Sequence, residues 1–226
     1  MRRLTRTRWA WVAVLLVAVA VPAVASGCAA TPSPTPVASL PTGWTRTSIT
    51  SDGYSIATPP SWSSVAIGGQ DIDAMIAELK STNSEIADLL QQARDAGQTF
   101  SFASNATDAA LIGDTGFAPN VIVEVTDARG HDAAYIATDT FIALSKLDSV
   151  HGDIEDAAYP LPADPSAHRL RYELTSSPDL TLVSTLFVLT RDDKVYGINV
   201  SAVGSQLPGL ESSIATMAQS FTFLAP

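Results

Sequence analysis

The sequence predicts a single α/β domain over residues 43–226, with helices packed on a mainly antiparallel sheet. Three observations predict this class. Apolar and polar residues alternate over 168–174 and 195–202, as in strands that bury one face. Residues 180–189 are nearly all apolar or Thr, which is typical of a central strand covered on both faces. Elsewhere apolar residues recur at spacings of three and four, the period of a helix with one buried side.

The first half of the domain alternates between predicted strands and helices. Residues 54–57 form a short alternating strand that ends at 59–60, where two prolines remove backbone donors, and 61–65 is expected to continue it after the turn. The stretches 72–79 and 86–93 each place apolar residues on one helical face. We therefore expect a helical pair or one bent helix there.

The order of elements continues to the end of the chain. Strands are predicted at 100–103 and 121–125, and a helix at 133–147. That helix places Ile136, Thr140, Leu144 and Leu147 on one side. After an acidic loop come the three strands at 168–174, 180–189 and 195–202, with a polar hairpin turn at 191–194. A last helix at 210–218 leads into Phe221-Thr222-Phe223.

Residues 1–27 are predicted to be a secretion signal. Four arginines precede an apolar stretch of 17 residues, 9–25, and the small residues Ala25, Ser26 and Gly27 end the segment. Cys28, the only cysteine of the chain, follows directly. A cysteine in this place resembles that of a bacterial lipobox. We therefore expect Cys28 to be diacylated and to become the mature N-terminus.

Two other readings of the N-terminus remain open. Residues 23–25 form an Ala-Val-Ala sequence that an ordinary signal peptidase would cut before Ser26. Alternatively, the apolar stretch is an uncleaved anchor, although its 17 residues fall short of the roughly 20 that span a hydrocarbon core. Ala25 also departs from the Leu or Val that leads most lipoboxes. Cys28 favours the lipoprotein, because a lone thiol in a secreted protein is otherwise hard to explain.

The segment 28–42 is predicted to be the lipidated cysteine and a tether. Residues 29–42 contain four prolines and no charge, and such a segment stays extended with a reach of about 40 Å. Of the 13 Lys and Arg residues four lie in the signal, so the mature chain keeps 9 against 23 Asp and Glu, a net charge of −14. An anionic lipid surface repels such a domain, so the lipid holds it at the membrane. Nucleic acid is excluded as a partner, because its binding needs clustered Lys and Arg.

The residues that carry chemistry elsewhere form no catalytic motif here. His131, His151 and His168 lack the short spacings of zinc sites, and we expect them on the surface. No serine stands in a G-x-S-x-G elbow. Asp153-Ile154-Glu155-Asp156 and Asp192-Asp193 lack the order of a calcium loop and are expected to be solvated. We expect no metal and no cofactor.

Two further features have a structural and a functional reading. Gly68-Gly69 precedes the first predicted helix, but Asp71 and Asp73 place negative charge where an anion would bind, so helix capping is the better reading. Trp44 and Trp62 lie near the tether, and we expect them to pack in the core. If they were exposed, they would indicate a docking surface.

Short motifs give the domain a family resemblance. Tyr54-Ser55-Ile56-Ala57, with Pro59 and Trp62 after it, resembles the opening of the PsbP and Mog1 fold. The closing Gln219-Ser220-Phe221-Thr222-Phe223 resembles the end of its sheet, and signal, cysteine and tether are laid out as in actinobacterial lipoproteins of the LpqN type. The resemblance covers residues 43–226 and implies an α/β/α sandwich with a non-enzymatic role in binding or assembly. It brings no functional residue with it.

Two classes of function follow. The first is a membrane-anchored extracytoplasmic lipoprotein that acts as a binding or accessory module for an envelope protein or a small ligand. The second is an envelope enzyme, a hydrolase with a dispersed active site, which would need histidines and acids to converge in a cleft. The tether and the lack of catalytic spacing favour the first class, and we expect no enzymatic activity. The sequence identifies neither the ligand nor the residues that bind it.

Overall fold

The computed structural model describes residues 39–67, 77, 91, 100–104, 112, 116–147, 149–177 and 180–225. The earlier strands are β1 (Thr45–Ile49), β2 (Tyr54–Thr58), β3 (Ser63–Ile67), β4 (Phe100–Ser104) and β5 (Asn120–Asp127). The later strands are β6 (Val150–Ala158), β7 (His168–Ser177), β8 (Leu180–Arg191), β9 (Lys194–Val203) and β10 (Thr222–Phe223). The helical elements in the same ranges are α4 (Ala133–Leu144), the short 3₁₀ helix η2 (Gly204–Gln206) and α5 (Leu207–Ser220).

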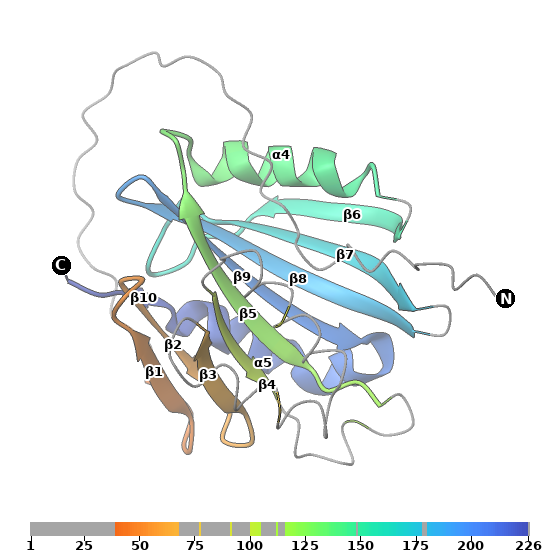
Figure 1. Ribbon diagram of the computed structural model, residues 1–226, viewed down its shortest axis with the longest axis horizontal. Coiled ribbons are helices and arrows are strands. Elements are labelled where there is room, and N and C mark those ends of the chain that lie inside the picture. The colour runs from red at the N-terminus through yellow and green to blue at the C-terminus, as the bar shows by residue number, and fades with distance from the viewer. Residues whose placement is uncertain are drawn as a thin grey trace, which may run out of the picture.

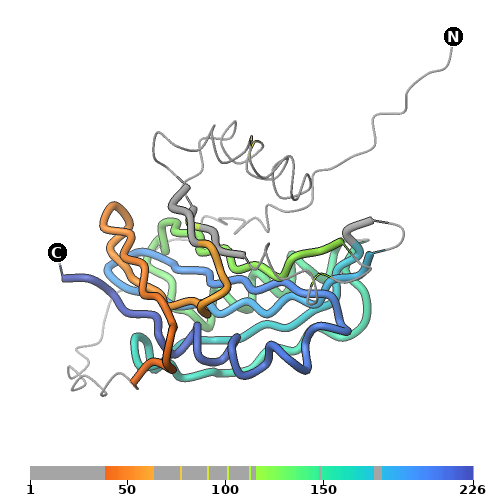
Figure 2. The backbone as a smooth tube through the Cα atoms, turned by 90° about the horizontal axis from the view of Figure 1, so that it is seen from below, coloured from red at the N-terminus to blue at the C-terminus, as the bar shows by residue number. Residues whose placement is uncertain are grey.

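The described strands form two sheets. A large sheet has the order β3-β4-β5-β9-β8-β7-β6, and a small one has the order β1-β2-β10. All paired strands are antiparallel. Helix α4 runs along the β6 end of the large sheet, whereas α5 lies behind the strands and reaches the small sheet (Figure 1). Figure 2 shows the β1–β2 hairpin beside the C-terminal segment at one end of the molecule.

The two helices lie on opposite faces of the large sheet, as strand β8 shows. Successive side chains of a strand point to opposite faces. Val183, Phe187 and Leu189 belong to the apolar core that includes residues of α5. Leu186 and Val188, between them, belong to a second core with residues of α4. The expected α/β/α sandwich with a mainly antiparallel sheet is therefore confirmed.

The small sheet is attached to the large one by an aromatic cluster. Tyr54 of β2 is fully buried, and its ring stacks on that of Phe221 with 5.2 Å between centroids. Tyr196 of β9 meets both rings edge-on, at 6.0 Å from Tyr54 and 5.7 Å from Phe221. The Tyr54 hydroxyl hydrogen-bonds Ser101 of β4, and burial raises its pKa. Residues of β2, β4 and β9 and the end of α5 thus meet in one cluster.

Most predicted elements are confirmed. The strand expected at 54–57 is β2, and the three late strands and their hairpin turn are β7, β8 and β9. The helix expected at 133–147 ends at Leu144, and the one expected at 210–218 starts earlier, at Leu207. The helices expected at 72–79 and 86–93 lie outside the described residues except Ala77 and Gln91, which are both helical.

Two expectations about strands need correction, and one strand was not expected. Residues 63–65 do lie in a strand after the turn at the prolines, but this strand, β3, pairs with β4 in the other sheet and does not extend the sheet of β2. The acidic stretch 153–156 is not a loop but part of β6, which pairs with β7 at the end of the large sheet. Strand β1 was not expected at all, because four of its five residues lie outside the core and leave little apolar pattern.

We predict that Phe221→Ala lowers the free energy of unfolding by about 3–5 kcal/mol, because it removes a fully buried ring from the aromatic cluster. Urea denaturation followed by tyrosine and tryptophan fluorescence measures the change. Tyr135→Ala is the control, because this aromatic side chain on α4 is 41% exposed and its loss is expected to cost about 0.5 kcal/mol. Equal losses in the two variants would contradict the role of the cluster.

Candidate functional site

A row of polar side chains crosses the large sheet on the face that carries α4. The register aligns one polar residue from each of four neighbouring strands: Tyr172 (β7), Ser184 (β8), Ser201 (β9) and Asn120 (β5). We call this set the polar row. All four members are buried. In the adjoining row on the same face, Asn199 lies between Leu186 and Ile122. Hydroxyl and amide groups therefore line up across four strands of this layer.

Tyr172 is the most enclosed member of the polar row, with 2% of its surface exposed. Burial raises its pKa to about 12, against the opposing effect of the polar side chains of Ser184 and Asn199 beside it. Ser184 and Ser201 hydrogen-bond each other at 2.9 Å between their hydroxyl oxygens. Side chains of the polar row are therefore hydrogen-bonded across neighbouring strands.

A carboxyl group lies on the same face, near the polar row. Glu124 of β5 is aligned with Gly197 of β9, two residues along the strand from the position of Ile122. Burial raises the pKa of Glu124. Desolvation therefore disfavours the charged form of the one carboxyl group on this part of β5.

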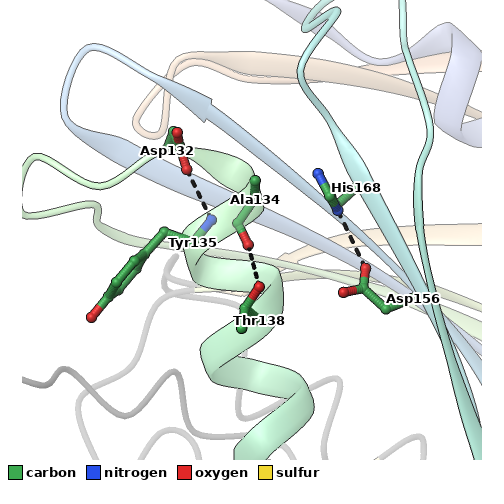
Figure 3. A network of polar contacts seen from close by, with 6 residues as sticks. All are labelled: Asp132, Ala134, Tyr135, Thr138, Asp156 and His168. Atoms are coloured by element: carbon green, nitrogen blue, oxygen red, sulfur yellow. Dashed lines mark hydrogen bonds and ion pairs between the residues drawn. The ribbon is translucent and has the colours of Figure 1, made fainter.

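Helix α4 covers the β6–β8 end of this face and begins at a side-chain cap. The Tyr135 amide donates to Asp132 Oδ1 at 2.8 Å, which satisfies one of the free donors of the first turn (Figure 3). Ile136, Thr140 and Leu144 face the sheet and are buried, as the sequence predicts. The Thr140 hydroxyl has no partner there, whereas that of Thr138, on the exposed side, donates to Ala134 O at 2.9 Å.

The structure places the three histidines in separate surroundings. His168 Nδ1 lies 3.2 Å from Asp156 Oδ1 across the β6–β7 pair (Figure 3). The ring of His131 stacks on that of Tyr135, with centroids 3.9 Å apart, and His151 is exposed. Within the described ranges, no three His, Cys, Asp or Glu side chains gather as a metal ion would require.

The acidic residues singled out in the sequence support local structure. In β6, Glu155 pairs with Arg169 at 3.6 Å and Asp156 with His168, so both carboxylates attach the edge strand to β7. In the β8–β9 turn, Asp193 Oδ1 accepts from the Gly130 amide at 2.6 Å. Asp192 and Asp193 both have positive φ there, a conformation that Asp tolerates in tight turns.

Sequence reasoning missed one buried carboxylate that makes several hydrogen bonds. Asp164, in the loop between β6 and β7, is buried and accepts from the backbone amide and hydroxyl of Ser166 at 2.8 and 2.6 Å. Its second oxygen accepts from the Thr190 amide of β8 at 2.8 Å. The Asp-Pro-Ser sequence signals a turn, but nothing in it indicates the bond to β8.

The remaining predicted residues divide into two groups. Ala25, Ser26, Gly27 and Cys28 lie outside the described residues, and so do Gly68-Gly69, Asp71 and Asp73. Trp62 is in the core as expected, and Trp44 is partly buried against it. Among the helices of the described part of the chain, none is long and apolar enough to cross a membrane.

No protein-family model matches the chain, and no curated protein is detectably similar to it in sequence. Solved structures similar to it include cyanobacterial PsbP from Synechocystis sp. PCC 6803, at 15% identity and a TM-score of 0.46, covering 84% of this chain and 99% of that one. The Ran-binding protein Mog1p of Saccharomyces cerevisiae has 10% identity and a TM-score of 0.48, covering 80% and 95%. LpqN of Mycobacterium tuberculosis, described as involved in cell envelope biogenesis, has 16% identity and a TM-score of 0.42, covering 55% and 72%.

These similar structures include the proteins for which the sequence resemblance is named: PsbP, Mog1 and LpqN. Identities of 10–16% and TM-scores below 0.5 assign neither a partner nor an activity to this chain. The fold class rests on the strand order of the large sheet and on the two helices, α4 and α5, that cover its opposite faces.

We predict that Tyr172→Phe flattens the loss of stability at alkaline pH. The pKa of Tyr172 is about 12 in the folded chain and about 10 when unfolded, so only the unfolded state loses the proton between these values. The free energy that the raised pKa of Tyr172 contributes to the folded state is fully present below pH 10 and falls as the pH rises. At pH 11 the free energy of unfolding is lower by about 1.4 kcal/mol for this reason. Urea unfolding at pH 8 and pH 11 measures the difference. An equal fall in the wild type and the variant would contradict the prediction, with Tyr135→Phe as the exposed control.

Proposed function

We propose that this chain is a lipid-anchored extracytoplasmic protein whose domain, residues 43–226, is a binding or accessory module for an envelope protein or a small ligand. The observation that carries the proposal is the order of the first 42 residues: basic residues, an apolar stretch, the small residues 25–27, Cys28 and an uncharged proline-rich segment. A cysteine that directly follows such a signal is suited to lipid attachment.

Several polar side chains of the domain are used within the fold. Arg46 of β1 donates to Ser55 Oγ at 3.0 Å and to the backbone oxygen of Ser220 at 2.8 Å, which joins β1 to β2 and to the end of α5. Arg171 pairs with Glu211 of α5 at 2.9 Å. Like Asp164, these groups hold elements of the fold together. We propose no catalytic role for them.

The tether fixes where the domain works. Two or more acyl chains hold a protein stably at a membrane, whereas one holds it only marginally. Strand β1 begins at Thr45, soon after the proline-rich segment, so a lipid on Cys28 would keep the domain within about 40 Å of the bilayer. Its partner is then expected at the extracytoplasmic face of the same membrane.

We predict that Cys28→Ala abolishes lipid attachment, because the chain has no other thiol. Cells fed an alkyne fatty acid are expected to label the wild-type protein but not the variant, which leaves the membrane fraction. Ser26→Ala is the control, because it keeps a small residue before the cysteine. Mass spectrometry of the N-terminal peptide separates the alternatives: a start at Ser26 or at Met1, without lipid, would contradict the anchor.

We predict that crosslinking in intact cells captures one envelope protein or one small molecule reproducibly with the wild type. Mass spectrometry of the protein recovered from membranes identifies it. The Cys28→Ala variant is the matched control, because it carries the same domain without the expected anchor, and it should capture less of the partner. Recovery of the wild-type protein alone would contradict the binding role.

A further inference from the structure

Strand β1 has a free edge among the described strands. It pairs there with β2 alone, so its other side carries no described strand. Figure 1 shows β1 at the outer end of the small sheet, next to β2. An edge strand presents unpaired backbone N–H and C=O groups, which makes it a template for pairing with a further strand. The edge of β1 is therefore a surface on which a second chain can dock by strand addition.

The hydrogen bonds of β2 show which backbone groups of β1 point outward. The Ala57 amide donates to Ser220 Oγ at 2.9 Å, on the side of β2 away from β1. Ala57 is aligned with Arg46 of β1. In an antiparallel ladder, the residues of such a non-hydrogen-bonded pair both turn their backbone groups away from each other, and such pairs alternate with hydrogen-bonded ones. The N–H and C=O groups of Arg46 and Ser48 therefore point to the free edge.

The edge at β1 lacks the features that protect the edge at β6. In β6 the register shifts between His151 and Glu155, and Asp153, Glu155 and Asp156 place carboxylates on the strand. Bulges and charges of this kind discourage pairing with another chain. Strand β1 pairs with β2 without a shift and contains no carboxylate, although the whole sequence has a net charge of −10. Two copies of this acidic chain therefore repel each other less at β1 than at β6.

The sequence of β1, Thr-Arg-Thr-Ser-Ile, complements itself when two copies run antiparallel. With Thr47 facing Thr47 of the second copy, Arg46 of each copy faces Ser48 of the other. The outward-pointing residues then form hydrogen-bonded pairs, joined by four backbone hydrogen bonds. Thr facing Thr is a favourable cross-strand pair, and the two arginines do not face each other. A register centred on Arg46 would oppose the like charges, and one centred on Ser48 would place Arg46 opposite the β1–β2 turn.

We propose that two copies of this chain pair through β1, antiparallel and centred on Thr47, so that their small sheets form one six-stranded sheet. The inference goes beyond the proposed function, which gives the small sheet no role. The pairing is short, because five residues span about 17 Å, and an interface of this size is weak in solution. The lipid proposed on Cys28 would strengthen it by confining both copies to one membrane.

Disulfide trapping tests the register, because Cys28 is the only cysteine of the chain. In Thr47→Cys the two new thiols would face each other in a non-hydrogen-bonded pair. The Cα atoms of such a pair are about 4.5 Å apart, within the range that a disulfide bridges. Membranes from cells that produce the full-length variant are oxidised with copper phenanthroline and analysed on a non-reducing gel. We expect a band of twice the monomer mass that dithiothreitol removes.

Matched variants separate pairing through β1 from random encounters. Ser48→Cys places its thiol on the same strand, but each Ser48 faces Arg46, so the two Ser48 Cα atoms would be about 9 Å apart. That distance exceeds the roughly 7 Å that a disulfide allows. His151→Cys places an exposed thiol on β6. Each control is expected to give about tenfold less dimer than Thr47→Cys. The oxidised wild type shows any dimer that forms through Cys28.

A proline tests the backbone hydrogen bonds of the proposed pair. Ser48→Pro, added to Thr47→Cys, removes one outward-pointing N–H, and proline is tolerated where the N–H of an edge strand faces solvent. We expect about tenfold less dimer than with Thr47→Cys alone, because the proline also obstructs the approach of the second strand. An unchanged midpoint of urea unfolding verifies that the domain of the double variant is folded.

Equal amounts of dimer in Thr47→Cys and in either Ser48→Cys or His151→Cys would overturn the inference. So would an undiminished dimer after the addition of Ser48→Pro. If Thr47→Cys gives no dimer while Cys28 carries lipid and crosslinking captures another protein, β1 does not pair with itself and the proposed function stands. If the dimer forms and the N-terminal peptide carries no lipid, the proposed anchor is wrong and the pairing through β1 stands.

Discussion

Burial of β8 on both faces is the constraint on which the rest of the structure depends. From Leu182 to Leu189 every side chain of this strand is buried, so each face of the sheet needs its own cover. Residues of α5 share one core with Val183, Phe187 and Leu189, and residues of α4 share the other with Leu186 and Val188. The aromatic cluster around Phe221 extends the first core to the small sheet. Removing either helix would expose half of a central strand, which explains why the fold is a sandwich.

The two cores differ in the polar groups they enclose. On the α5 face, the rings of Tyr54, Tyr196 and Phe221 pack against one another. The buried hydroxyl of Tyr54 is hydrogen-bonded to Ser101. On the α4 face the polar row introduces hydroxyls and amides into the layer, and Ser184 and Ser201 hydrogen-bond each other there.

The edge of the large sheet shows how local charge serves the fold. Strand β6 has no partner on its outer side among the described strands, and its register shifts between His151 and Glu155. A bulge and carboxylates on an edge discourage pairing with another chain. Glu155 and Asp156 also pair with Arg169 and His168 of β7. The same acidity keeps the domain from an anionic lipid surface, so the proposed lipid on Cys28 has to provide the attachment.

The sequence by itself determined the features that depend on neighbouring residues. The alternation in β7 and β9, the apolar run of β8 and the periodicity of α4 and α5 are all local patterns, and the sandwich follows from their order. The export signal and the tether are predictions from local patterns of the same kind. Only the tertiary structure decided which strands share a sheet and which side chains align across it. It placed β3 away from β2, made the acidic stretch 153–156 an edge strand, and connected Asp164 to Thr190. The polar row depends on the register of four strands, one of which, β5, is distant in the chain from the other three, and Ser184 or Asn120 alone carries no sign of it. Such alignments are set by packing of the sheet, because register is strongly specified wherever one face of a strand is buried.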